Sequence, residues 1–182
     1  MINRAPVLTL WVAVVAQQQG FSREAALTFG RAISGLLAHS KGVSIGVAER
    51  KEKDPAAEER KRQREAEQGV EKVDVFGMHI KAQKANDEMH AVDANDKPIN
   101  PATVDGYLRR AFGDRLSAAE GALKELAEAH PPDALGHEAY NLYSNFRPQV
   151  PQGQSGWGRK GVLELDRIHE MAQHAQRQHS EP

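Results

Sequence analysis

The segment from Ala16 to Phe29 has the residue spacing of a DNA-binding helix-turn-helix. In that motif an alanine on the first helix is followed four residues later by a turn glycine, and then by an apolar residue and often a serine. The residues at the matching positions are Ala16, Gly20, Phe21, Ser22, Ala26 and Phe29. The polar side chains that would then be free to contact phosphates or base edges are Ser22, Arg23, Thr28 and Arg31.

A plain helical hairpin accounts for the same residues without DNA. Gly20 can take the left-handed conformation that ends a helix, and Ser22 can cap the next one. Leu27 would face outward in the DNA-binding arrangement, where a polar residue is expected. Both interpretations stay open.

A glycine-rich segment near the C-terminus is the second candidate site. Gly156 to Gly161 is formally a G-x-G-x-x-G, but a Pro-rich stretch precedes it where a dinucleotide-binding fingerprint requires a strand. Consecutive backbone amides in such a loop can still hold a phosphate or a carboxylate. The predicted anion-binding residues are Gly156, Trp157, Gly158, Arg159 and Lys160. In the simpler alternative the glycines only permit sharp turns, and Trp157 covers the core.

The eight histidines form no recognisable metal-binding motif. His169 with His174, and His79 with His90, lack the four-residue helical spacing or the nearby acidic partner of zinc sites. The sequence also contains no His-Glu-x-x-His, nucleophile elbow or P-loop. We therefore expect surface histidines, no metal, no cofactor and no catalytic residues, and an enzyme stays among the open alternatives.

Composition restricts the function classes further. The chain has no cysteine, which excludes disulfides and thiolate chemistry and suits a reducing compartment. Its net charge of -1 gives no general attraction to nucleic acid or to an anionic membrane, so any such contact needs a local basic patch. The apolar run 7–16 is too short to cross a bilayer and is expected to form a buried helix. We expect a cytoplasmic protein that does not contact membranes.

The elements that must position these residues divide the chain into four parts. Residues 1–48 are predicted to form a helical hairpin, with a first helix over residues 6–18 and a second helix that starts after Ser22. Residues 49–72 mix both charges in equal number and predict a linker or an exposed helix. Residues 73–178 are predicted to form a β-hairpin with its turn at residues 84–87, followed by a helical unit. Residues 179–182 are predicted to form a frayed tail.

Capping signals refine the helical unit. Asn100 and Pro101 predict one helix start, and the sequence from Ser117 to Glu120 is a capping box that predicts another. Residues 162–165 are predicted to be extended. The predicted fold class is mainly α: a helical hairpin plus a C-terminal helical unit with a small β-hairpin.

Both ends of the chain resemble a group of bacterial proteins of unknown function. The likeness rests on residues 5–16, on Gly20-Phe21 and residues 24–28, and on residues 146–151 with 156–161. The resemblance implies an intracellular bacterial protein, and it indicates no activity or ligand.

Three functions remain open at this point. The first is a non-catalytic binding or regulatory protein that could contact nucleic acid through the helix-turn-helix-like hairpin. The second is a protein or enzyme that binds a small ligand or phosphate metabolite with the glycine loop 153–161. The third is a protein–protein adaptor, with a protein partner or a second copy of the chain covering the hairpin.

Overall fold

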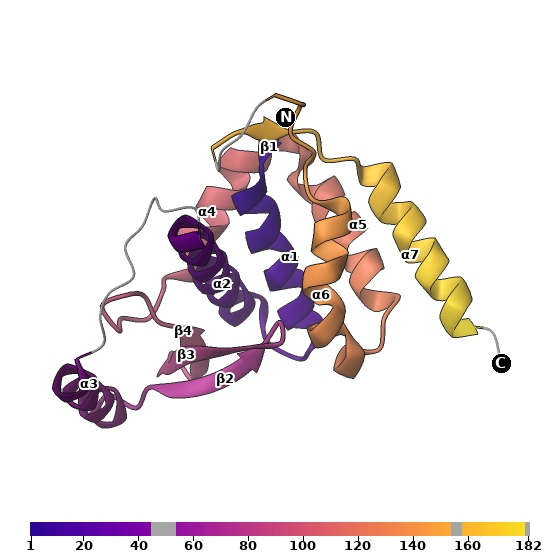
Figure 1. The fold of residues 1–182 in the computed structure, drawn as a ribbon. Helices are drawn as coiled ribbons and strands as arrows, with labels where there is room; N and C mark the ends of the chain where they lie inside the picture. Colours follow the sequence, from indigo (N-terminus) through magenta and orange to yellow (C-terminus); the bar gives the residue numbers. More distant parts are fainter. Residues whose placement is uncertain (45–53, 154–157, 181–182) are drawn as a thin grey trace.

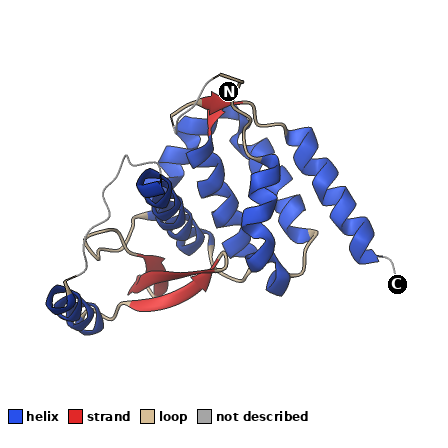
Figure 2. Cartoon of the chain, in the orientation of Figure 1, coloured by secondary structure: helices blue, strands red, loops and turns tan. Residues whose placement is uncertain are grey.

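The computed structural model describes residues 1–44, 54–153 and 158–180. It confirms the predicted fold class: the protein is mainly α, with a small antiparallel β-hairpin sheet at one side of a helical body (Figures 1 and 2). Within these residues, no helix combines the length and the apolar character needed to cross a membrane.

Helix α1 (Arg4–Gln18) lies in the middle of the helical body. The Asn3 side chain caps it by accepting a hydrogen bond from the Ala5 amide, and every residue from Pro6 to Ala16 is buried. The surrounding elements are α2 (Arg23–Ser44), α4 (Pro101–Phe112), α5 (Leu116–Glu128) and α6 (Pro132–Phe146) (Figure 1). A helix that is apolar all round must be covered all round, so the predicted buried first helix is confirmed.

Helices α1 and α2 form the predicted hairpin and pack closely. Gly20 makes the turn with a φ of 104°, and the Ser22 hydroxyl caps α2 by accepting from the Ala25 amide. Further along, Gly30 lies directly against the Thr9 carbonyl, and the Thr9 and Ser34 hydroxyls form a buried hydrogen bond of 2.7 Å. The absence of a side chain at Gly30 allows the two backbones to approach each other.

The charged segment and the sheet follow. Helix α3 (Pro55–Glu67) has no buried residue and contacts the sheet through an ion pair between Glu65 and Lys81. Strands β2 (Glu71–Val75), β3 (Met78–Ala85) and β4 (Glu88–Ala91) form an antiparallel sheet in that order. The turn between β3 and β4 is the predicted one, with positive φ at Asn86 and Asp87. The turn between β2 and β3, where Phe76 and Gly77 also have positive φ, was not predicted from the sequence.

The C-terminal elements complete one hydrophobic core that includes residues of the N-terminal hairpin, the sheet and the later helices. Helix α7 (Leu165–Ser180) packs on α5, and strand β5 (Lys160–Gly161) pairs with β1 (Ile2–Asn3) (Figure 1). Two predicted boundaries were wrong. A 3-10 turn (Gly113–Arg115) leads into α5, so Ser117 lies inside the helix and caps nothing, and Leu165 is already helical rather than extended.

The contact at Gly30 predicts a position-specific effect on stability. A Cβ at Gly30 would overlap the Thr9 carbonyl, whereas a Cβ at Gly35 on the same helix meets nothing within 4 Å. Gly30→Ala should lower the free energy of unfolding by about 1–3 kcal/mol through overpacking. Gly35→Ala should raise it by about 0.5–1 kcal/mol, because alanine is the better helix former. Urea denaturation of the two variants tests this, and equal effects would contradict the close packing of α1 on α2.

His130, between α5 and α6, predicts how stability depends on pH. Its side chain is 9% exposed, its Nδ1 lies 3.2 Å from Glu138 Oε2 without a well-directed hydrogen bond, and its ring is 5.8 Å from that of His179 on α7. Burial lowers the pKa of His130, Glu138 raises it in part, and His179 lowers it further.

Because the unfolded chain then binds a proton more readily than the folded one, stability should fall as the pH drops from 7 through the ordinary histidine pKa of about 6.5. Thermal unfolding between pH 7.5 and 5 should show a shallower fall for His130→Leu than for the wild type. His174→Gln, on the exposed face of α7, should keep the wild-type slope. Identical slopes for the wild type and His130→Leu would contradict this role of His130.

Candidate metal centre

Strand β4 packs against the N-terminal end of α2, where Thr28 in the second turn of the helix connects the two elements. Its hydroxyl accepts a 2.9 Å hydrogen bond from the Ala91 amide of β4 and donates one of 2.6 Å to the Ala25 carbonyl. Thr28 is fully buried, and Leu27 beside it is only 4% exposed. The strand therefore covers Thr28, which the helix-turn-helix interpretation left free to contact a ligand.

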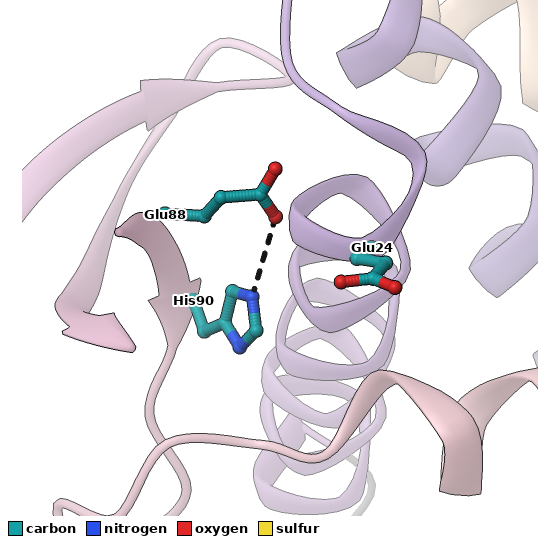
Figure 3. Close-up of side chains that lie close together, drawn as sticks. All are labelled: Glu24, Glu88 and His90. Carbon is teal, nitrogen blue, oxygen red and sulfur yellow. Dashed lines mark ion pairs between the residues drawn. The ribbon is translucent and has the colours of Figure 1, made fainter. Parts of the chain in front are cut away.

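Three side chains of types that can ligate a metal ion come together here and form a candidate metal-ligand cluster (Figure 3). Glu24 belongs to the first turn of α2, while Glu88 and His90 stand two residues apart on β4, which places them on the same face of the strand. One donor atom from each lies within 4.8 Å of the other two. Glu24 is exposed, Glu88 is half-buried and His90 is buried.

The imidazole of His90 is the unusual member of this cluster. The residue is 3% exposed, and its Nε2 is shielded from solvent with no hydrogen-bond partner among the described residues. The nearest carboxylate atom, Glu88 Oε2, lies 3.7 Å away, beyond hydrogen-bonding distance (Figure 3). A buried polar atom left unpaired costs about 1–3 kcal/mol, so native proteins rarely leave one without a partner. An imidazole nitrogen beside two carboxylates is the arrangement that a metal ion would complete.

Ser22 orients one of the carboxylates. Its hydroxyl donates a 2.9 Å hydrogen bond to Glu88 Oε2 and accepts one from the Ala25 amide at the start of α2. Hydrogen bonds of this kind fix the direction of ligating carboxylates in metal sites. The same serine thus caps the helix and holds the glutamate.

Beside the cluster lies a cleft with a volume of about 690 Å³, within the range of small-molecule sites. Glu24 and His90 are part of its wall. The remaining wall comes from α2 (Arg23 and Leu27), the end of β3 and the turn that follows it (Ala85 and Asn86), residues 98–100, and α4 (Pro101, Ala102, Asp105 and Arg109).

The two arginines of the cleft are held by carboxylates. Arg109 Nε donates a 2.6 Å hydrogen bond to Asp105 Oδ2, and Arg23 pairs with Glu120 and, at 3.5 Å, with Asp105. The hydrogen bond from Arg109 lowers the pKa of Asp105 despite partial burial, and Arg23 lowers it further. Asp105 is therefore a carboxylate at neutral pH and anchors both guanidinium groups.

The predicted nucleic-acid-binding residues lie at and around this contact between α2 and β4. Ser22 is bonded to Glu88, Arg23 to Glu120 and Asp105, and Thr28 to the backbone of β4. Arg31 is exposed, further along α2. Three of the four side chains thus make contacts within the protein, and nucleic-acid binding through this helix stays a prediction.

The predicted anion-binding residues lie elsewhere. Gly156 and Trp157 fall outside the described residues, while Gly158, Arg159 and Lys160 are exposed. Lys160 pairs with Asn3, next to the start of α1, whereas the metal-ligand cluster is near its end. The 15 residues of α1 span about 22 Å, so the structure does not bring the two predicted surfaces together.

Sequence reasoning missed this cluster because it expected His90 on the surface. The alternation Glu88-x-His90 within a predicted strand was a usable signal, since it places a carboxylate and an imidazole on one face. Glu24 carries no such signal, because only the tertiary packing of β4 on α2 brings it near His90.

Comparison with known proteins adds no function to this geometry. No protein-family model matches the chain, and no curated protein or solved structure shows a significant similarity to it. A functional conclusion must therefore rest on the chemistry of the site.

Proposed function

We propose that this protein binds a divalent transition-metal ion, with Zn²⁺ as the best match, through Glu24, Glu88 and His90. The observation that carries the proposal is the buried Nε2 of His90, which has no hydrogen-bond partner among the described residues and faces two carboxylates. A bound ion would satisfy this nitrogen and offset the charge of the two glutamates.

The donor set favours zinc over the hard cations. Ca²⁺ and Mg²⁺ take oxygen ligands almost exclusively, whereas zinc binds both imidazole and carboxylate. Ligand atoms bound tetrahedrally at about 2.1 Å lie about 3.4 Å apart. The distance of 3.7 Å between Glu88 Oε2 and His90 Nε2 is close to this value. A small side-chain movement would therefore bring these two atoms to the separation that a tetrahedral zinc ion requires.

Three protein ligands leave part of the coordination sphere free. Structural zinc sites use four protein ligands, while catalytic and ligand-binding sites keep a position for water or substrate. Glu24 and His90 line the cleft, so the free position would open into it. This supports a functional site over a purely structural one.

Titration calorimetry with Zn²⁺, Ca²⁺ and Mg²⁺ tests the proposal. The protein should bind one Zn²⁺ and neither hard cation, and zinc should raise the melting temperature, because it binds the folded state. His90→Gln, Glu88→Gln and Glu24→Gln should each lower zinc affinity about a hundredfold or more, since outer-sphere partners alone are worth 10–100-fold.

His79→Gln is the matched control. His79 also pairs with a carboxylate, Asp74, but both side chains are largely exposed at 75% and 78%. This variant should bind zinc as the wild type does. The proposal fails if no stoichiometric zinc binding occurs, or if His79→Gln weakens it as much as His90→Gln.

A further inference from the structure

We infer that the cleft binds a small organic molecule through a carboxylate or phosphate group, with the metal as one anchor and Arg109 as the other. This inference rests on the proposed zinc site and extends it by naming the class of ligand. The cleft of about 690 Å³ is far larger than a hydrated ion needs and lies in the range of small-molecule sites.

Arg109 is the donor best placed for such a group. Its side chain is 71% exposed within the cleft wall, and Asp105 holds it through Nε, one turn earlier on α4. An arginine has five N–H donors in a planar fork that matches carboxylate and phosphate oxygens. The contact with Asp105 orders the side chain before any ligand arrives, which lowers the entropic cost of binding.

The neighbouring donors are less free. Arg23 already uses two guanidinium nitrogens, one for Glu120 and one for Asp105. The amides of Ala25 and Ala102, at the starts of α2 and α4, are capped by Ser22 and Asn100. Arg109 is therefore the residue that would donate hydrogen bonds to a bound anion.

Charge makes anion binding depend on the metal. Arg23, Arg109 and Lys124 carry three positive charges beside Asp105 and Glu120. Glu24 and Glu88 raise the number of carboxylates to four, so the group keeps a net negative charge, and the excess lies at these two glutamates. Without a cation, these two charges repel an anion from the cleft. A divalent ion offsets them and offers a free coordination position, so metal and anion should bind with positive coupling.

Titration calorimetry with phenyl phosphate and benzoate, on zinc-loaded and zinc-free protein, tests the inference. The zinc-loaded protein should bind at least one of the two, and the zinc-free protein should bind it at least roughly tenfold more weakly. Arg109→Gln should weaken the anion roughly ten- to a hundredfold and leave zinc affinity unchanged. Arg110→Gln, an exposed neighbour on α4 outside the cleft wall, should change neither.

The outcomes separate the two proposals. If the protein binds zinc but neither anion, or binds the anion equally well without zinc, this inference is overturned while the zinc site stands. Equal anion affinity of Arg109→Gln and the wild type also overturns it. If zinc itself does not bind, the proposed function fails and the inference fails with it.

Discussion

The burial of α1 on every side is the constraint on which the rest of the structure depends. A helix that is apolar all round has no face for water, so other helices must enclose it, and α2, α4, α5 and α6 do so. Gly30 allows α2 to approach its backbone, and the Trp11 indole donates a buried 2.8 Å hydrogen bond to the Ala139 carbonyl of α6. Residues of the N-terminal hairpin and of the C-terminal helices therefore share one core.

The same constraint positions the candidate metal centre. Because α2 is fixed along α1, the N-terminal end of α2 has a defined place, and Thr28 connects strand β4 to it through a hydrogen bond. Glu24, Glu88 and His90 meet at that contact, and Ser22 orients Glu88 there. The cluster thus rests on two elements that are held by packing and by hydrogen bonds. Such rigid support is what a metal site requires of its protein.

The sequence was most informative where a local signal decides the structure. The capping residue Asn100, the turn at Asn86 and the apolar character of α1 each act over a few residues, so the fold class and the starts of α2 and α4 were predictable. Thr28 was placed on the wrong face, because helical periodicity does not show that a distant strand covers it. The metal-ligand cluster escaped prediction for the same reason, since its three members come from two elements that meet only in the tertiary structure.

X-ray absorption at the zinc edge of the loaded protein tests the central claim most directly. The first shell should contain one imidazole nitrogen and several oxygens, and the imidazole contribution should be lost in His90→Gln. A shell with no imidazole, with two or more, or with one that persists in His90→Gln would contradict zinc binding by Glu24, Glu88 and His90.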